Sequence, residues 1–457
     1  MYNSFDSFKE YIKGKKVSVI GIGISNTPLI YMLKEFGAFV TAHDKKTIDE
    51  LGKTAKELEK AGVVLKTGDS YLDDIEADVV FKTPGMRFDN PALIKAKENG
   101  AIVTSEMEVF FDVCPSKIIA VTGSDGKTTT TSLIYEMLKA EGFNCHLGGN
   151  IGKPVLFRVG EMKKDDFVVL ELSSFQLHTM KKSPLISVVT NITPNHLDVH
   201  KSYDEYIDAK RNIIKYQNEN GICVLNAKNE VTSGFISEAK GKAISFSAKG
   251  IADISLKDNY ICFGVEKILD INDIKIPGMH NVENYMSAIG ATLGLVKKET
   301  VEKVAKEFGG VPHRIELVRE LDGVKYYNSS IDSSPNRTIN TLNVFKKPVI
   351  LIAGGKDKGI PYDEIGPAIC DKVKVLILVG KTAKVIKEAT LKEFNKRNEK
   401  CTLPIYVLDS YEEAVNKAYT EAKSGDIVIM SNASTSFDMF KNFEERGNLF
   451  KQLVNSL

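Results

Sequence analysis

Short apolar runs alternate with longer segments of helical periodicity along almost the whole chain. The clearest runs occupy residues 16–20, 39–43, 78–81, 118–121, 167–170, 186–190, 349–352, 375–378 and 427–430. They are rich in Val and Ile, and turn residues separate them from the helical segments. Such runs between helices are typical of parallel strands whose two faces are both covered by helices. The pattern therefore predicts an α/β fold made of parallel sheets.

The chain of 457 residues is longer than one such sheet requires, since a domain takes roughly 100–200 residues. A Gly-Gly pair followed by Pro312 indicates a boundary near residue 310, because it stops a helical pattern. A new unit also begins near residue 106, before the strand at 118–121. We therefore expect three α/β units, at residues 1–105, 106–310 and 311–457.

Charge and cysteine usage narrow the class of protein. The formal net charge is +1, which argues against a broad nucleic-acid surface or a polybasic membrane anchor. The six cysteines form no CxxC pair, and this favours free thiols in a reducing compartment. The chain has no run of 18 apolar residues and no apolar stretch of signal-peptide type at its start. We expect a cytoplasmic protein that binds neither nucleic acid nor membrane.

A glycine-rich turn joins the strand at 118–121 to the next helical segment. It reads Thr122-Gly-Ser-Asp-Gly-Lys-Thr128. Backbone N–H groups in such a turn bind phosphate, the Lys127 ammonium can reach the β- and γ-phosphates, and the Thr128 hydroxyl can bind Mg²⁺. The full phosphate-loop spacing has a further glycine where this chain has Val121, so an ordinary strand-to-helix turn is the alternative. The flanking strand and helix favour the phosphate site.

Acidic and histidine side chains follow two later strands. Glu171 stands at the C-terminal end of the strand at 167–170, and this end of a parallel strand faces the ligand crevice. A carboxylate there can hold the Mg²⁺ of a nucleotide, or it can cap a helix or form an ion pair. His196, Asp198 and His200 follow the next strand and offer three potential metal ligands. By themselves these three residues fit a polar loop better than a metal site.

A second glycine turn follows the first strand. Gly21 and Gly23 form a GxG sequence, Asn26 replaces the third glycine of a dinucleotide fingerprint, and Asp44 ends the second strand. Such a turn holds a nucleotide against a helix N-terminus, and Asp44 can accept a hydrogen bond from a ribose hydroxyl or a base. The nucleotide is not specified, and an NAD-dependent oxidoreductase is the natural alternative.

The last apolar run leads into a hydroxyl-rich turn and a helix. Ser431, Ser434 and Ser436 lie in this turn, where hydroxyl and N–H groups can bind a carboxylate. Phe437, Phe440 and Phe443 follow with the spacing of ordinary core residues. The residues by themselves predict only a small anion site.

Several segments in a fixed order resemble the Mur ligase family across the whole chain. They are the turn at 122–128, Gly149-Asn-Ile-Gly152, Glu171-Leu-Ser-Ser-Phe-Gln176, Asn191-Ile-Thr-Pro-Asn-His196-Leu-Asp198, Gly278-Met-His-Asn281-Val-Glu-Asn284, Pro312-His-Arg314 and Phe437-Asp-Met-Phe-Lys-Asn-Phe-Glu-Glu-Arg-Gly447. The resemblance implies a Rossmann-like N-terminal domain for a UDP-sugar and a central P-loop-type ATPase domain. It also implies a Rossmann-like C-terminal domain for an amino acid.

The last of these segments is most similar to family members that add D-glutamate to UDP-N-acetylmuramoyl-L-alanine. The resemblance therefore implies an ATP-dependent ligase of peptidoglycan precursor synthesis. In the family reaction ATP phosphorylates the L-alanyl carboxylate, and the amine of D-glutamate attacks the acyl phosphate. We expect ATP, two Mg²⁺ ions and these two substrates as ligands, and we expect a monomer.

Residues that match family motifs carry the expected roles. Those matching the ATP site are Gly123, Ser124, Asp125, Gly126, Lys127, Thr128, Thr129, Asn281, Asn284 and Arg314. Those matching the Mg²⁺ ligands are Thr128, Glu171, His196 and Lys210, the last as a carbamate, and Lys127, Glu171, His196 and Lys210 are expected to be catalytic. The UDP-sugar site is matched by Ile24, Ser25, Asp44, Thr83, Gly85, Asn150 and Ser173, and the D-glutamate site by Lys358, Ser436, Phe437 and Phe443. Asp198 and His200 do not carry over as ligands.

One loop departs from the family pattern. Many members have Asn-Asp-Ser where this chain has Asn328-Ser329-Ser330, and here an acid follows three residues later, at Asp332. We hypothesise that Asp332 partly replaces the missing aspartate. Three extended residues span up to about 10 Å, so the replacement requires a tightly turned loop. A solvated Asp332 is the alternative.

Three other functions stay open on the sequence. One is a sibling ligase that adds L-alanine or a diamino acid, or that adds glutamate to folate. Such a ligase would share the central unit. An oxidoreductase would use the Gly21 turn, and a non-catalytic nucleotide-binding regulator would explain Ser329.

Overall fold

The computed structural model describes residues 2–23, 26–195, 199–357 and 359–457. Contacts divide the chain into two compact units. The first unit holds residues 1–271 and 282–304, and the second unit holds residues 272–281 and 305–457. Three sheets with flanking helices make up the chain, so the predicted α/β fold is confirmed. The boundaries predicted near residues 105 and 310 remain predictions.

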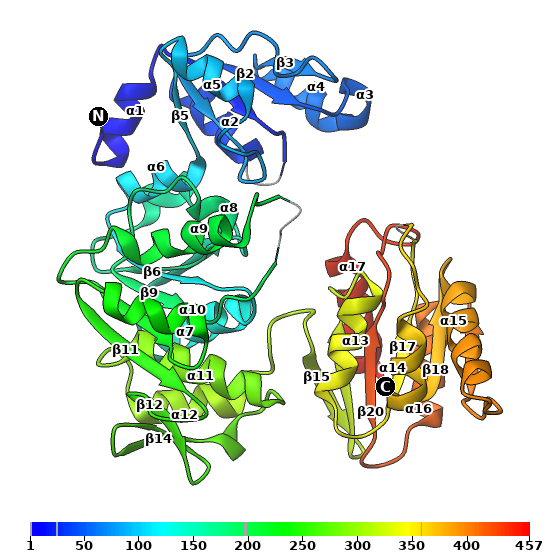
Figure 1. Ribbon diagram of the computed structural model, residues 1–457. Helices are drawn as coiled ribbons and strands as arrows, with labels where there is room; N and C mark the ends of the chain where they lie inside the picture. Colours follow the sequence, from blue (N-terminus) through cyan, green and yellow to red (C-terminus); the bar gives the residue numbers. More distant parts are fainter. Residues whose placement is uncertain (1, 24–25, 196–198, 358) are drawn as a thin grey trace. The chain divides into compact units, whose positions relative to one another are not determined.

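The first sheet is parallel and has the strand order β3-β2-β1-β4-β5. Its strands are β1 (Lys16–Ile20), β2 (Phe39–Asp44), β3 (Val64–Thr67), β4 (Val79–Phe81) and β5 (Ile102–Thr104). The helices of this part are α1 (Phe5–Ile12), α2 (Asn26–Glu35), α3 (Ile48–Leu51), α4 (Lys53–Lys60) and α5 (Pro91–Glu98). Because β1 lies between β2 and β4, the residues that follow these three strands meet at one edge of the sheet (Figure 1).

The second sheet has the order β14-β13-β12-β11-β10-β9-β6-β8-β7 and also belongs to the first unit. Its strands are β6 (Lys117–Thr122), β7 (Cys145–Gly149), β8 (Phe167–Glu171), β9 (Ile186–Val189), β10 (Ile222–Asn226), β11 (Lys242–Ser247), β12 (Ile254–Lys257), β13 (Tyr260–Phe263) and β14 (Glu266–Asp270). The strands from β7 to β12 are parallel, whereas β13 and β14 extend the sheet in antiparallel fashion.

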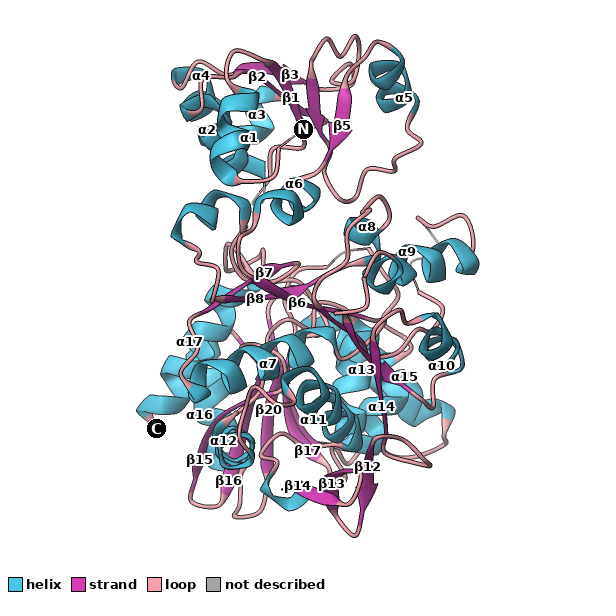
Figure 2. Cartoon of the chain, turned by 90° about the vertical axis from the view of Figure 1, so that its left-hand side faces the viewer, coloured by secondary structure: helices cyan, strands magenta, loops and turns pink. Residues whose placement is uncertain are grey.

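Helices and single turns cover this second sheet. They are α6 (Glu106–Val113), α7 (Lys127–Glu141), η1 (Leu156–Glu161), α8 (Ser174–Leu177), α9 (Tyr203–Lys215), α10 (Glu230–Gly234), η2 (Phe235–Glu238), η3 (Ile271–Asp273), α11 (Met279–Thr292) and α12 (Lys298–Glu307). Helix α7 packs against β6, β7 and β8 (Figure 2). Strand β6 is buried from Ile118 to Thr122, which explains its unbroken apolar sequence.

The third sheet, in the second unit, has the order β15-β16-β20-β17-β18-β19. Its strands are β15 (Glu316–Leu321), β16 (Val324–Ser329), β17 (Val349–Ala353), β18 (Val373–Val379), β19 (Ile405–Leu408) and β20 (Ile427–Ser431), with only β15 antiparallel to its neighbour. The helices are α13 (Pro335–Val344), α14 (Ile365–Lys372), α15 (Ala383–Lys396), α16 (Tyr411–Glu421) and α17 (Phe443–Ser456). Leu351 packs with α13, α14 and α15, and Ile350 and Ile352 pack with α16 and α17. Helices therefore bury both faces of β17.

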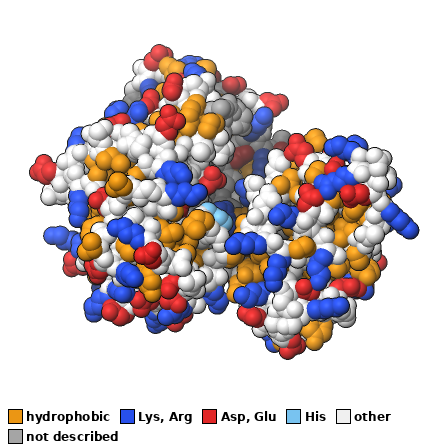
Figure 3. All heavy atoms as spheres, turned by 60° about the horizontal axis from the view of Figure 1, so that its bottom comes forward, with side chains coloured by type: hydrophobic (Ala, Val, Ile, Leu, Met, Phe, Trp, Pro, Cys, Tyr) orange, Lys and Arg blue, Asp and Glu red, His pale blue; other side chains and the backbone are white. Residues whose placement is uncertain are grey.

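The surface agrees with the nearly neutral composition. On the face that Figure 3 shows, basic and acidic side chains are interspersed. No helix among the described residues combines the length and the apolar character needed to cross a membrane.

Candidate active site

The glycine-rich turn lies between β6 and the start of α7, and two glycines shape it. Gly123 has φ +149°, and a Cβ at this position would overlap the Thr190 hydroxyl. Gly126 caps α7 with φ +76°, and a Cβ there would overlap the Asn284 side-chain oxygen. No other residue type fits either position without a shift of its neighbours.

Hydrogen bonds from the end of β9 hold the turn in place. The N–H groups of Ser124 and Asp125 donate to the backbone and side-chain oxygens of Asn191 at 2.8 and 3.0 Å. The Thr190 hydroxyl donates to the Asp125 carbonyl at 2.6 Å. The first N–H groups of a helix have no partner within the helix, so this fixed turn presents the start of α7 as an anion site.

Two predicted metal ligands meet beside the turn. Glu171 is 2% exposed at the end of β8. The Thr128 hydroxyl donates to its Oε2 at 2.7 Å, and the Asn150 amide donates to its Oε1 at 2.8 Å. A carboxylate and a hydroxyl oxygen are donors that suit a hard cation such as Mg²⁺. The structure thus brings together Thr128 and Glu171, while His196 lies outside the described residues.

The predicted carbamate residue lies on the other side of the same turn. Lys210, on α9, is 2% exposed, and its ammonium donates to the Gly123 carbonyl at 2.8 Å and the Thr122 hydroxyl at 3.3 Å. Burial, and then the nearby Lys127 ammonium, hold the pKa of Lys210 well below its usual range. A lowered pKa favours the neutral amine, which is the form that reacts with carbon dioxide.

Lys127 and Asn284 complete the part of the predicted ATP site that lies in the first unit. The Lys127 ammonium donates to the Ser124 carbonyl at 2.9 Å. Asn284, on α11, accepts from the Thr130 hydroxyl at 3.3 Å. The other two predicted ATP residues, Asn281 and Arg314, belong to the second unit.

The glycine turn after β1 is closed by side chains of its own sheet. Asp44 accepts from the N–H groups of Ile22 and Lys46 at 2.7 and 2.9 Å. Asn26, at the third-glycine position, donates to the carbonyls of Ile20 and Gly21 at 3.0 and 3.1 Å. Asp44 thus orders the turn even before any ligand binds.

Of the remaining residues predicted for the UDP-sugar, Thr83, Gly85 and Ser173 are among the described residues. Thr83 lies against the Cα of Gly21, which has φ +90°, and the Thr83 carbonyl accepts from Met86 N–H at 3.1 Å across Gly85. Ser173 caps α8, and its hydroxyl accepts from Gln176 N–H at 3.2 Å. Ile24 and Ser25 lie outside the described residues.

Two of the residues predicted for D-glutamate, Ser436 and Phe437, follow the end of β20 in the second unit. Lys356, in the loop after β17, exchanges backbone hydrogen bonds with Thr435 at 2.8 and 3.2 Å. Ser436 is buried and Phe437 is 62% exposed. Phe443 begins α17. Lys358 lies outside the described residues.

Arg446 is a residue of this region that the sequence did not single out. It is fully buried on α17, and its guanidinium donates to the Ser330 hydroxyl at 2.9 Å, the Ser330 carbonyl at 2.7 Å and the Ser434 carbonyl at 3.2 Å. It therefore ties the loop after β16 to the turn after β20. The only hint in the sequence is its position one helical turn after Phe443.

Comparison with known proteins assigns this combination of fold and site to a class. The chain matches the Mur ligase middle domain over residues 121–292 and the Mur ligase, glutamate ligase domain over residues 313–433. It belongs to the Mur ligase family, as the sequence motifs predicted. Among its relatives are proteins named UDP-N-acetylmuramoylalanine--D-glutamate ligase from Acetivibrio thermocellus and Ruminiclostridium cellulolyticum, each 53% identical, and from Clostridium novyi, 51% identical. Each alignment covers 100% of this chain and 100% of the relative.

Solved structures of more distant proteins share the fold. UDP-N-acetylmuramate-alanine ligase MurC from Thermotoga maritima is 19% identical with a TM-score of 0.59, over 97% of this chain and 99% of that one. MurF ligase from Thermotoga maritima, in complex with ADP, is 17% identical with a TM-score of 0.56, over 98% and 97%.

Proposed function

We propose that the chain joins D-glutamate to UDP-N-acetylmuramoyl-L-alanine in an ATP-dependent reaction that releases ADP and phosphate. The observation that carries this proposal is the Thr128–Glu171–Asn150 group beside the glycine-rich turn, in a chain 53% identical to ligases named for this reaction. The reaction forms an amide through an acyl phosphate and supplies a precursor of peptidoglycan.

The turn and Lys127 are the groups that act on the transferred phosphoryl. A carboxylate that attacks a polyanion needs compensation of negative charge, and a positioned ammonium supplies it. We assign this role to Lys127, because it starts α7 next to the two shape-determining glycines. The N–H groups of the same helix turn hold the phosphates.

Thr128 and Glu171 would hold Mg²⁺, together with His196 and a carbamate on Lys210. When bound, the ion would neutralise charge on the phosphates. The burial and the lowered pKa of Lys210 support carbamylation, and an added carbamate would be an oxygen ligand of the kind that hard cations prefer. Two Mg²⁺ ions, a monomeric state and a cytoplasmic location are further parts of this proposal.

D-Glutamate is proposed to bind with Lys358, Ser436, Phe437 and Phe443. An amino acid with two carboxylates and one amine is held in one handedness when all three groups are placed at once. We therefore expect the L-enantiomer to be rejected. The UDP-sugar is proposed to bind with Ile24, Ser25, Asp44, Thr83, Gly85, Asn150 and Ser173.

Release of phosphate tests the function. The chain is incubated with ATP, Mg²⁺ and UDP-N-acetylmuramoyl-L-alanine, and D-glutamate, L-glutamate or meso-diaminopimelate is added in parallel. Release that depends on the UDP-sugar and on D-glutamate alone supports the proposal. Release with meso-diaminopimelate instead would indicate a sibling ligase, and equal rates with both enantiomers of glutamate would contradict the assignment.

A further inference from the structure

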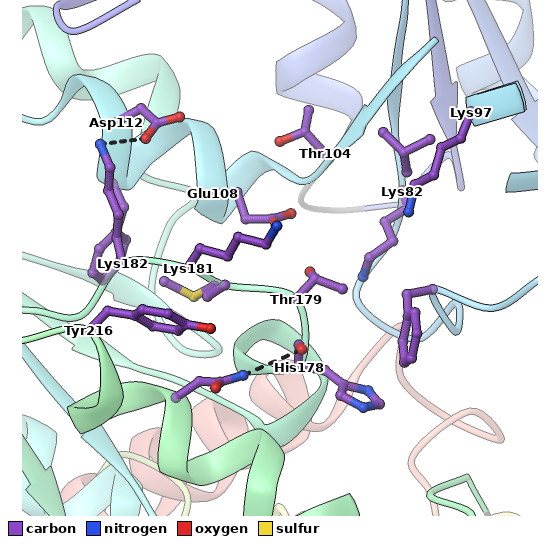
Figure 4. A pocket seen from close by; sticks show the side chains of 15 residues that line it. Lys82, Lys97, Thr104, Glu108, Asp112, His178, Thr179, Lys181, Lys182 and Tyr216 are labelled. Carbon is purple, nitrogen blue, oxygen red and sulfur yellow. Dashed lines mark hydrogen bonds and ion pairs between the residues drawn. The ribbon is translucent and has the colours of Figure 1, made fainter. Parts of the chain in front are cut away.

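A cavity of about 630 Å³ lies in the first unit, and none of the residues assigned to a substrate or metal above lines it, although Lys82 in its wall directly precedes Thr83. Its walls come from the ends of β4 and β5, from α6, and from the segment after α8 (Figure 4). Small-molecule sites commonly enclose roughly 300–1,000 Å³. The cavity is therefore large enough for a small metabolite.

Lys82 is the most unusual residue of this cavity. It directly follows β4, is only 3% exposed, and contributes to the cavity wall. Within the described part of the chain, no hydrogen bond or ion pair reaches its ammonium, and its nearest charge effects come from Glu108 and Lys97. Burial lowers the pKa of Lys82, and Lys97 adds to this effect while Glu108 opposes it. Burying a charge without a partner is energetically unfavourable. A bound anion would therefore stabilise the Lys82 ammonium.

Other charged side chains around the cavity leave an excess of positive charge. They are Lys97, Lys181, Lys182, Glu108 and Asp112. Lys182 is already paired with Asp112 at 2.5 Å. With Lys82, four ammonium groups face two carboxylates, which leaves a formal charge of +2. Figure 4 shows Lys82 and Lys97 reaching in from one side and Lys181 from the opposite side.

The rest of the wall offers hydroxyl and aromatic groups. Thr104 and Thr179 contribute hydroxyls, and Phe111 and Tyr216 contribute rings. Asn212 holds this wall, because its amide donates to the Leu177 carbonyl at 2.9 Å. The cavity thus combines a cationic end with aromatic surface.

We propose that this cavity binds a small molecule that carries a phosphate or diphosphate group, with that group at Lys82 and the organic part against Phe111 and Tyr216. Lysine binds phosphate as a point charge, and a phosphate group carries about −1.5 to −2 near neutral pH, which matches the excess charge of the wall. The site is separate from the proposed ligase reaction, because none of the residues assigned to that reaction line it.

A tryptophan probe in the cavity tests the proposal. The chain has no tryptophan, so Tyr216→Trp gives a fluorescence signal from this cavity alone. The full chain with this substitution is titrated with inorganic phosphate, inorganic diphosphate and glycerol 3-phosphate. We expect a saturable change of emission, and a Kd at least tenfold weaker when Lys82→Met is added. Lys53→Met, a lysine with an 89% exposed side chain on α4, is the matched control and should leave the Kd unchanged.

The three titrations also distinguish the source of the phosphate. Tighter binding of the ester than of the inorganic ions indicates an organic metabolite, and equal or weaker binding of the ester indicates a free ion. No response to any of the three, or a response that Lys82→Met leaves unchanged, would overturn the proposal. So would loss of the response through competition with UDP-N-acetylmuramoyl-L-alanine, because the cavity would then belong to the substrate site.

Thermal unfolding gives a second readout that does not depend on the probe. Without ligand, Lys82→Met should raise Tm, since it removes a buried charge that has no partner. Diphosphate should raise the Tm of the unsubstituted chain more than that of Lys82→Met. An equal shift in both proteins would place the bound diphosphate elsewhere and contradict the proposal. Neither readout requires ligation, so this proposal and the proposed function can fail independently.

Discussion

Asp332 folds back on Ser329, and its backbone N–H donates to the Ser329 carbonyl at 3.0 Å. The Asp332 side chain is buried, and its Oδ2 accepts from the hydroxyls of Thr341 and Ser431 at 2.7 and 2.8 Å. Burial raises the pKa of this carboxyl, and the hydroxyls of Ser329, Thr341 and Ser431 oppose that rise. The loop is thus the tight turn that replacement of an aspartate at position 329 requires.

We predict that Asp332→Ala lowers kcat at least tenfold and that Ser329→Asp in the same background restores much of it. The reason is that both positions place a carboxylate at the same turn. Steady-state phosphate release checks this. Asp332→Asn is the control, because it preserves the shape and part of the hydrogen bonding but removes the charge. If Asp332→Ala is silent while Ser329→Asp alone raises the rate, Asp332 does not compensate and position 329 is simply a defect.

Lys127→Ala is expected to lower turnover by about 10²-fold or more while the protein stays folded. The lysine contacts the Ser124 carbonyl at the turn, and the variant removes a positive charge from the place where the phosphoryl group is proposed to transfer. Circular dichroism checks that the variant is folded, and phosphate release measures its turnover. Lys139→Ala, an exposed lysine on the same helix, should leave the rate unchanged. Near-normal turnover by a folded Lys127→Ala protein would remove Lys127 from the mechanism.

Lys210→Ala is expected to lose activity and to regain part of it when short carboxylates are added. The buried amine lies beside the Gly123 carbonyl, so a small anion can occupy the space that a carbamate would fill. Lys215→Ala, an exposed lysine at the end of the same helix, serves as the control and should need no carboxylate. Full activity of Lys210→Ala without additives would rule out an essential carbamate.

Burial on both faces made several strands recognisable in the sequence, although β10 was missed despite its burial inside a sheet. The strands β1, β6 and β17 are buried along most of their length, so each has a largely apolar sequence. Strands β3 and β14 were missed, because they lie at sheet edges and much of their side-chain surface is solvated. Their short polar sequences look like loops, and only the neighbouring strand reveals them.

Those parts of the candidate site whose geometry follows from a short stretch of sequence could be predicted. The glycines around Lys127 and the acid at the end of β8 follow from strand-turn-helix order. Arg446 and Lys82 were missed, because nothing in the neighbouring sequence distinguishes a buried cation from an exposed one. Distant segments bury both residues, and two hydrogen bonds of Arg446 go to Ser330, which is more than a hundred residues away.

The ion pair between Arg87 and Glu205 leads to a prediction about acid stability. Arg87 follows β4, Glu205 lies on α9, and the guanidinium donates to both carboxylate oxygens at 2.8 and 3.0 Å. The hydrogen bonds from Arg87 lower the pKa of Glu205 from 4.5 to about 2. A carboxyl whose pKa is depressed by folding contributes stability above its unfolded pKa and loses that contribution as the pH falls. The window in which the contribution is lost therefore runs from 4.5 down to about 2.

We predict that Arg87→Ala lowers the free energy of unfolding by about 2 kcal/mol near neutral pH, as expected for hydrogen bonds to a charged, partly buried group. The difference between the two proteins should shrink as the pH falls below 4.5, because Glu205 then takes up a proton when the chain unfolds, whereas the pair keeps it ionised in the folded chain. Urea unfolding at a series of pH values measures both effects. Lys53→Ala breaks an exposed pair with Glu57 and should cost only about 0.3–0.5 kcal/mol. A difference for Arg87→Ala that stays constant down to pH 3 would show that its cost does not come from the charge of Glu205.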